Sequence, residues 1–241
     1  MAYDHTVATS RIPTVKGIRT ITVDLDDTLW EIHPVIQRAE RRLYEWLGEY
    51  YPRITARFSV EAMRTLRDDV MEEHRDKLHD LTLIRRAVLT RAANAAGYTE
   101  FRLEEAFAVF DEVRNDVDLF PEARPALMAL RERFTVIAVT NGNANLEKIG
   151  IGDLFDAHVN AAMAGAAKPH RPIFDAAVKA GRASAEETLH VGDHPFYDVH
   201  GAREAGLRTV WVNRNGDSWP QDYDEADLEI RHVGELPELM R

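Results

Sequence analysis

Apolar side chains recur at helical spacing between residues 31 and 114. One series is Val35, Ala39, Leu43 and Leu47, and another is Val60, Met63, Leu66 and Val70. An α-helix has about 3.6 residues per turn, so this spacing places each series on one helix face and predicts amphipathic helices. Two more helices are expected near 82–96 and 103–113. Turn-forming residues near 51–52, 94–97 and 116–121 separate these helices into a compact all-α unit.

Outside that segment, short apolar runs alternate with helical stretches. The runs occupy 18–23, 134–139, 157–159, 188–191 and 209–212. This alternation is typical of a parallel sheet covered by helices on both faces. We therefore predict an α/β fold.

The order of the two patterns predicts the domain organisation. Residues 18–30 and 115–241 are expected to form a Rossmann-like parallel sheet, and residues 31–114 a helical domain inserted after its first strand. Residues 1–17 are expected to form an N-terminal extension.

Composition narrows the class of protein. With 241 residues and 45% hydrophobic content, the chain can bury a sizeable core. Its formal charge of -11 argues against nucleic acid and anionic membranes as partners, but a small anion can still bind at a locally positive site. The absence of cysteine excludes disulfides, thiolate zinc sites and a cysteine nucleophile.

The sequence also bears on location. It shows neither the apolar region of a signal peptide nor a run of roughly 20 apolar residues, so a cytoplasmic location is expected. The oligomeric state is left open.

Residues with reactive or ligating side chains follow the predicted strands. In chain order they are Asp24, Asp26, Thr28, Thr140, Asn141, Gly142, Lys168, Asp193 and Asp198. In open parallel sheets, ligands bind at the carboxyl ends of the strands, where the strand order reverses. Several buried carboxylates at one edge need a counter-charge, so a bound cation is expected.

These residues form four motifs in a characteristic order. They are Asp24-x-Asp26-x-Thr28, Thr140-Asn141-Gly142, Lys168-Pro169 and Gly192-Asp193-x-x-x-x-Asp198. A single D-x-D-x-T recurs by chance, but four motifs at successive strand ends are specific. The chain resembles the haloacid dehalogenase (HAD)-like hydrolase superfamily, in its subfamily I with a helical cap, and within it the branch of bacterial flavin mononucleotide (FMN) phosphatases. The resemblance implies that the inserted helices are that cap.

Two aspartates have the chemistry for phosphoryl transfer. Asp24 is the candidate nucleophile, because a carboxylate can attack phosphorus to form an aspartyl-phosphate. Asp26 is the candidate general acid, which protonates the leaving alkoxide and later deprotonates the attacking water.

The other motifs supply groups for the phosphoryl oxygens. Thr140 and the amides of Asn141 and Gly142 can donate hydrogen bonds, and Lys168 supplies a positive charge in the transition state. Thr28 is expected to support the nucleophile loop.

The metal expected at this site is Mg²⁺. Asp24 and Asp193 offer carboxylate oxygens, and the resemblance adds the backbone carbonyl of Asp26. Oxygen ligands of this kind select a hard cation. Asp198 is expected to orient Lys168 or a metal-bound water.

Other residues near the motifs receive ordinary interpretations. Asp27 is expected to point away from the site in a solvated or helix-capping role. Arg85, Arg86 and Arg91, together with Thr82, have the chemistry to bind a distal anion or sugar of a substrate, but a solvated helix face is the preferred interpretation. His194 stands where some members of the resembling family carry a second acid, so no role of that acid is transferred.

The preferred function is a Mg²⁺-dependent phosphatase of a small phosphorylated metabolite, of the FMN or sugar phosphate type. A phosphomutase would use the same residues and differ only in excluding water. A 2-haloacid dehalogenase needs no metal and no acid two residues after the nucleophile, so Asp26 and Asp193 argue against it. A non-catalytic phosphate-binding protein would be expected to lose the nucleophile or the metal acids.

Overall fold

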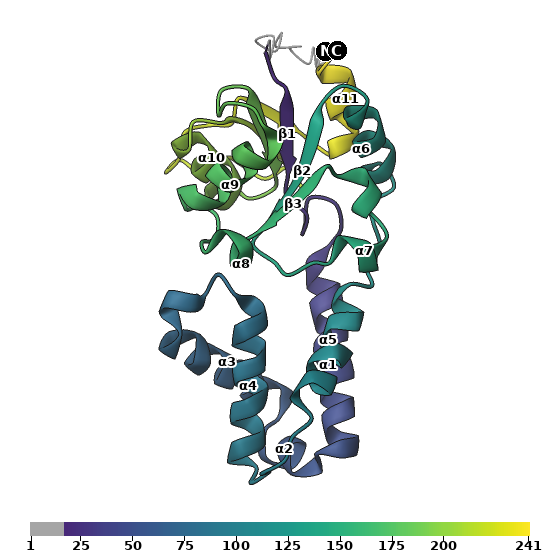
Figure 1. Cartoon of the computed structure of the whole chain (residues 1–241), viewed down its shortest axis with the longest axis vertical. Helices are drawn as coiled ribbons and strands as arrows, with labels where there is room; N and C mark the ends of the chain where they lie inside the picture. Colours follow the sequence, from purple (N-terminus) through teal and green to yellow (C-terminus); the bar gives the residue numbers. More distant parts are fainter. Residues whose placement is uncertain (1–16) are drawn as a thin grey trace, which may run out of the picture.

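The computed structural model describes residues 17–241, so the predicted N-terminal extension lies, apart from Gly17, outside the described residues. Figure 1 shows an α/β unit that contains the sheet and, below it, a purely helical unit. The described C-terminus lies at the end of the α/β unit away from the helical unit.

The sheet has six parallel strands in the order β3-β2-β1-β4-β5-β6. The strands are β1 (Thr20–Val23), β2 (Thr135–Thr140), β3 (Ala157–Asn160), β4 (Thr188–Gly192), β5 (Arg208–Val212) and β6 (Leu228–Ile230). The predicted fold class, a Rossmann-like parallel sheet, is confirmed. Sequence analysis missed β6, because its three residues include only one fully buried side chain and show no apolar run.

Side chains alternate between the two faces of the sheet. Ile21 and Val23 pack with α6 (Ala123–Arg131) and α11 (Leu236–Leu239) on one face. The opposite face, which includes Ile137 and Val139, packs with α9 (Arg171–Gly181) and α10 (Gly201–Glu204). Both faces are therefore covered, which explains why the strands read as continuous apolar runs.

The remaining helical segments of the α/β unit are short. They are α7 (Leu146–Ile149), α8 (Ala161–Ala164), the 3-10 turns Gly152–Leu154 and Val233–Glu235, and a π-helical turn, Pro195–His200.

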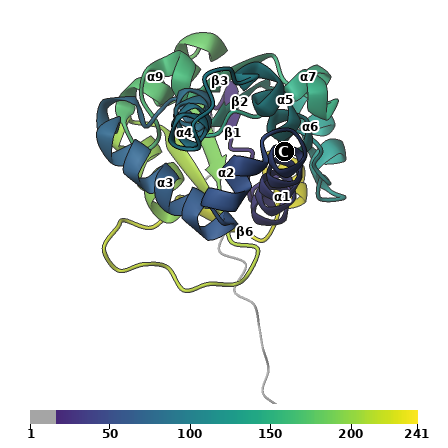
Figure 2. The same ribbon diagram turned by 90° about the horizontal axis from the view of Figure 1, so that it is seen from below.

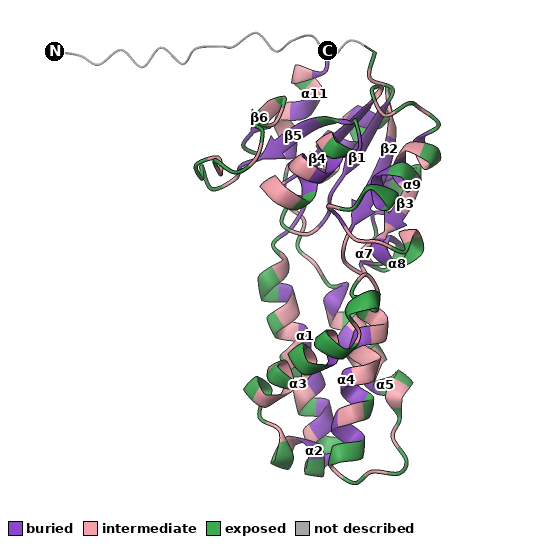
Figure 3. Cartoon of the chain, turned by 90° about the vertical axis from the view of Figure 1, so that its left-hand side faces the viewer, coloured by how far each residue is buried: buried purple, intermediate pink, exposed green. Residues whose placement is uncertain are grey.

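The helical unit, called the cap below, lies between β1 and α6 in the chain. Its helices are α1 (Ile32–Tyr50), α2 (Pro52–Arg57), α3 (Val60–Glu73), α4 (Leu81–Ala95) and α5 (Leu103–Arg114), with a 3-10 turn at Arg75–Lys77. Seen from below, α3 and α4 lie beside the pair α1 and α5 (Figure 2). Figure 3 shows the buried positions of α1, α4 and α5 in purple. Their side chains pack into one cluster, which includes Leu43, Leu47, Leu89 and Phe110.

Two chain segments connect the cap with the sheet. They lie side by side, because Phe120 donates a backbone hydrogen bond to Leu29 at 2.8 Å. β1 is flanked by β2 and β4, so the loop after β1 lies between the loops that follow its neighbours. That arrangement brings the predicted motifs to one place. Within residues 17–241, no helix has the length and apolar character needed to cross a membrane.

Candidate active site

Asp24 is the first residue beyond β1, and its side chain is buried. Its backbone amide continues the sheet by donating to Val191 at 2.8 Å. The Thr28 hydroxyl lies 3.2 Å from a carboxylate oxygen of Asp24 and 3.2 Å from one of Asp193. One hydroxyl hydrogen cannot neutralise two carboxylates, so this pair of acids retains surplus negative charge when ionised.

Asp27 occupies a left-handed backbone conformation, with φ of 63°. Its carboxylate accepts a hydrogen bond from the backbone amide of Ile32 at 3.0 Å, which caps the start of α1. Asp27 therefore has the helix-capping role that the sequence predicts, although, besides burial, its charge also raises the pKa of Asp193 and Asp26.

Lys168 reaches Asp24 from the loop that follows α8. Its buried ammonium group forms ion pairs with Asp24 and Asp198, the latter at 2.7 Å, and donates to the Val139 carbonyl at 3.3 Å. The side-chain amide of Asn141 binds both backbone groups of Lys168. Its Oδ1 accepts from Lys168 N at 2.7 Å, and its Nδ2 donates to Lys168 O at 3.1 Å. The Asn141 side chain thus positions the lysine.

His190 lies in the middle of β4 and supports Asp198, a role that sequence analysis missed. Its Nε2 lies 3.0 Å from the Asp198 carboxylate, and its Nδ1 lies 2.8 Å from the Thr22 hydroxyl. Burial lowers the pKa of His190 and so favours the neutral ring, which carries one N–H. A carboxylate only accepts, so that hydrogen is on Nε2 and Nδ1 accepts from Thr22. The backbone amide of His194 donates to the other Asp198 oxygen at 3.0 Å.

The charges of these buried groups fall into two sets. Burial opposes ionisation of Asp198, but Lys168 and His190 outweigh it and lower the pKa of Asp198. Burial likewise opposes the charge on Lys168, but the two aspartates raise the pKa of the lysine. Lys168 and Asp198 thus form a charged pair.

Asp24 and Asp193 form the second set. Burial, together with the neighbouring acids, raises the pKa of Asp24 well above its usual value and the pKa of Asp193 to about 7. Neither acid has enough positive charge nearby to offset its loss of hydration.

This surplus fits a hard cation. Asp24, Asp193 and Asp198 each offer a carboxylate oxygen, and these oxygens lie within 4.8 Å of one another. Asp198 already forms an ion pair with Lys168 and a hydrogen bond with His190. Asp24 and Asp193 are therefore the acids that need a further counter-charge. An all-oxygen donor set of this charge suits Mg²⁺.

Asp26 lies beside a cap residue that sequence analysis did not single out. One guanidinium nitrogen of Arg114, at the end of α5, lies 2.9 Å from both Asp26 carboxylate oxygens, and the Trp30 indole donates to Asp26 at 2.9 Å. Burial raises the pKa of Asp26, although Arg114 and Trp30 oppose that shift. Arg114 is 2% exposed, and its other terminal nitrogen, Nη1, has no partner within residues 17–241.

The sequence does contain a feature that could have revealed the buried position of Arg114, namely its place in the apolar series of α5. Ala106, Phe110 and Arg114 follow one another at four-residue spacing and all are buried, so a charged residue ends the apolar face of α5.

The loop after β2 packs closely against Asp26. The amide of Gly142 donates to the Thr140 hydroxyl at 2.9 Å. A Cβ atom on Gly142 would lie 2.7 Å from an Asp26 carboxylate oxygen and 3.1 Å from Arg114 Nη2, so a glycine is required there. The structure thus brings the motif residues to one edge of the sheet: Asp24, Asp26, Thr28, Thr140, Asn141, Gly142, Lys168, Asp193 and Asp198.

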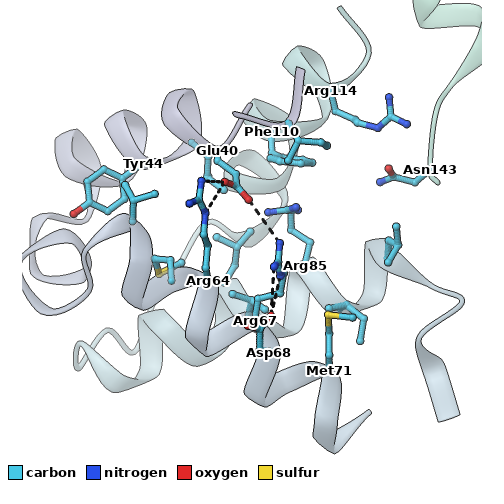
Figure 4. A pocket seen from close by; sticks show the side chains of 18 of the residues that line it. Glu40, Tyr44, Arg64, Arg67, Asp68, Met71, Arg85, Phe110, Arg114 and Asn143 are labelled. Atoms are coloured by element: carbon cyan, nitrogen blue, oxygen red, sulfur yellow. Dashed lines mark hydrogen bonds and ion pairs between the residues drawn. The ribbon is translucent and has the colours of Figure 1, made fainter. Parts of the chain in front are cut away.

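A cavity of about 450 Å³ extends from this edge into the cap. Asp26, Arg114, Gly142 and Asn143 line it where it meets the α/β unit, and its remaining lining comes from α1, α3, α4 and α5 (Figure 4). Arg85 also lines it, so the expectation that Arg85 belongs to a solvated helix face is wrong. Its place on α4 explains why: Arg85 precedes buried Val88 and Leu89 by three and four residues.

An acidic cluster at the carboxyl edge of a parallel sheet, covered by an inserted helical unit, is the arrangement that the resemblance to haloacid dehalogenase-like hydrolases implies. The sequence profile of haloacid dehalogenase-like hydrolases matches residues 18–206. The chain belongs to this family, which confirms the family and the class of enzyme predicted from the sequence.

Named relatives include phosphatases. An Escherichia coli K12 protein, 5-amino-6-(5-phospho-D-ribitylamino)uracil phosphatase YigB, is 31% identical over 92% of this chain and 96% of its own length. A phosphoserine phosphatase of Thermus thermophilus is 35% identical over 64% of this chain and 63% of its own length.

Structural similarity extends to dehalogenases. A crystal structure described as 2-haloacid dehalogenase from Pseudomonas syringae pv. tomato DC3000 is 36% identical. It has a TM-score of 0.87 and covers 92% of this chain and 98% of that one.

Proposed function

We propose that the chain is a Mg²⁺-dependent phosphatase that hydrolyses a small phosphorylated metabolite through an aspartyl-phosphate on Asp24. The observation that carries this proposal is the pair Asp24 and Asp26, held in different environments. Asp24 contacts Lys168 and neighbours Asp193, whereas Asp26 is held by Arg114 and Trp30. Two carboxyl groups in distinct environments suit a nucleophile and a separate acid–base group.

In the first step, a carboxylate oxygen of Asp24 bonds to phosphorus while the bond from phosphorus to the ester oxygen breaks. Asp26 gives its proton to the departing alkoxide, and its raised pKa favours the protonated form needed for that transfer. In the second step, Asp26 takes a proton from water as the water attacks the phosphorus of the aspartyl-phosphate. Inorganic phosphate leaves, and Asp24 and Asp26 return to their starting forms.

Positive charge and hydrogen bonds support the phosphoryl group during both steps. Lys168 is held charged beside Asp24 by Asp198, and Thr140 and Asn141 lie at the carboxyl end of the neighbouring strand β2. Preorganised charges of this kind stabilise developing negative charge without rearranging solvent. The cap restricts water around the site, which strengthens each of these interactions.

Mg²⁺ would be held by the carboxylates of Asp24 and Asp193, with the backbone carbonyl of Asp26 as the third protein ligand. It would keep Asp24 ionised and neutralise charge on the phosphoryl oxygens.

The expected substrate is a phosphate monoester of the FMN or sugar phosphate type, and the expected location is the cytoplasm. The phosphatases among the relatives support the reaction class.

The first test is hydrolysis of p-nitrophenyl phosphate with Mg²⁺ and after chelation with EDTA. We expect Mg²⁺-dependent release of p-nitrophenol. Asp24→Asn should abolish turnover but still show a cooperative thermal unfolding transition, which indicates that the variant is folded. Asp153→Asn is the control, because Asp153 is an exposed acid of the α/β unit outside the acidic cluster. Substantial activity in Asp24→Asn would reject the nucleophile assignment.

The structural relative from Pseudomonas syringae makes haloacid dehalogenation the second candidate. In that reaction an aspartate nucleophile displaces halide from carbon, and neither Asp26 nor Asp193 has an evident role. Chloride release from 2-chloropropionate, independent of Mg²⁺, would favour it over phosphate hydrolysis.

A further inference from the structure

Arg85 is the arginine of the cap cavity that lacks a carboxylate partner. Arg64 pairs with Glu40 at 3.1 Å, Arg67 lies 3.8 Å from Glu40 and 3.3 Å from Asp68, and Arg114 pairs with Asp26. Arg85 makes no ion pair and no side-chain hydrogen bond within the described residues. Figure 4 shows its guanidinium beside the Phe110 ring, with no dashed line to another group.

The Arg85 guanidinium lies over an aromatic ring. Its central carbon is 3.5 Å from the centroid of Phe110, a distance at which the ring face attracts the cation. Burial lowers the pKa of Arg85 to about 10, and the charge of Glu40 only partly offsets this. Glu40 is already engaged by Arg64 and Arg67, so the cavity retains one positive charge without a counterpart.

The rest of the lining restricts what can approach that charge. Most of its surface is apolar and comes from residues such as Ile36, Leu43, Leu47, Met63, Val88 and Leu89. A polyol would leave its hydroxyl groups unsatisfied among these side chains, whereas a planar ring with apolar faces would not. A guanidinium also presents its donors in one plane, which matches the acceptor oxygens of a carbonyl-bearing ring.

We propose that Arg85 is a specificity-determining residue that binds the ring carbonyl oxygens of a phosphate monoester carrying a planar heterocycle. The inference rests on the proposed phosphatase function and selects, within it, heterocyclic substrates over sugar phosphates. The cavity volume of about 450 Å³ lies within the usual range for small-ligand sites. The phosphate lies at the Asp26 end of the cavity and the ring extends toward Arg85.

The test compares Arg85→Met with the wild type on FMN and uridine monophosphate, which carry ring carbonyls, and on phenyl phosphate, which does not. Loss of a charged hydrogen bond corresponds to about a 10- to 100-fold change. We expect kcat/KM to fall by that factor on the two carbonyl-bearing substrates, mainly through KM. The value for phenyl phosphate should stay within about threefold. Arg85→Lys, which keeps the charge but not the planar donors, should recover part of the loss.

Arg86→Met is the matched control. Arg86 follows Arg85 on α4 and lies over Phe107, but it pairs with Glu104 and does not line the cavity. It should leave all three substrates unchanged. Equal losses on phenyl phosphate and on the carbonyl-bearing substrates, or no loss on any, would overturn the role of Arg85.

A binding measurement separates this inference from the proposed reaction. Riboflavin has the carbonyl-bearing ring without the phosphate, and its fluorescence reports binding. Weaker riboflavin binding in Arg85→Met than in Arg86→Met supports the ring site even if no phosphate ester is hydrolysed, and equal binding by the two variants rejects it. Inactivity of the wild type on every phosphate ester would reject only the phosphatase function.

Discussion

The sequence predicts the contacts of residues that belong to a motif, but not those of residues that reach the site only through the packing of a helix or strand. Asp24 and Lys168 come from different loops, yet each follows a recognisable strand or motif, so their meeting could be inferred. Arg114 contacts Asp26 across 88 positions of sequence, and that contact depends on how α5 packs. His190 stands between Leu189 and Val191 in an apolar strand, where sequence alone gives no reason to expect a partner such as Asp198.

Arg114→Met tests the contact with Asp26. The variant removes two hydrogen bonds that orient the Asp26 carboxylate, so the water attack on the aspartyl-phosphate should slow by about 100-fold. The first step with p-nitrophenyl phosphate should be less affected, because nitrophenolate leaves with little help from an acid. Stopped-flow absorbance should therefore show a burst of p-nitrophenol, and a slow reaction without a burst would contradict the prediction.

Gly142→Ala tests the close contact between the β2 loop and Asp26. The added methyl group would force Asp26 and Arg114 apart, so kcat should fall by about 10-fold or more with little change in melting temperature. Gly48→Ala in α1 is the control, because its nearest neighbour is Thr55 at 3.7 Å. Alanine suits a helix interior better than glycine by about 0.5–1 kcal/mol, so Gly48→Ala should stabilise the protein slightly. Unchanged kcat in Gly142→Ala would show that the contact is unimportant.

At the scale of helices and strands, the spacing of apolar residues predicts a helix well where these residues form an uninterrupted helix face. The series from Val35 to Leu47 predicts α1, whose four apolar members are all buried. It was less informative for α4, where Arg85 belongs to the same face as Val88 and Leu89 but was assigned to solvent because of its charge. A charged residue within an apolar series is better interpreted as a cavity-lining group than as a break in the pattern.

The edge strand β3 carries a pH-dependent contribution to stability. Burial lowers the pKa of His158, and its Nε2 has no partner within residues 17–241. The unfolded chain, with a histidine pKa of about 6.5, therefore binds a proton more readily than the folded one. This contribution is present above that pKa and is lost as the pH falls below it.

His158→Gln removes the titrating group and should isolate this effect. The free energy of unfolding is measured for both proteins by urea titration at pH 8 and at pH 5. Between these pH values the wild type should lose more stability than the variant. His33→Gln is a suitable control, since His33 is exposed on α1. A difference independent of pH would contradict the prediction.

At the scale of the whole molecule, the acids Asp24, Asp193 and Asp198 lie close enough together to hold a cation. A cation that binds there links occupancy of the site to stability of the fold. At 100 times its dissociation constant, Mg²⁺ would stabilise the protein by about 2.7 kcal/mol. For a chain of this size that corresponds to roughly 5–10 °C in melting temperature.

Differential scanning fluorimetry with increasing Mg²⁺ measures that link. The wild type should show the rise, and Asp193→Asn should show little, because it removes a proposed ligand. Asp153→Asn provides a control, since Asp153 is an exposed acid of the α/β unit and is absent from the acidic cluster. An equal rise in Asp193→Asn would place the ion elsewhere.

The backbone hydrogen bond between Phe120 and Leu29 marks the point where the chain enters and leaves the cap. Because entry and exit lie side by side, the length and content of the segment between them hardly constrain the sheet. Insertions are tolerated where the two ends of the inserted chain are close together. The same sheet can therefore be combined with a different inserted unit, and substrate choice can change during evolution as long as the new unit still supplies a group that holds Asp26, as Arg114 does here.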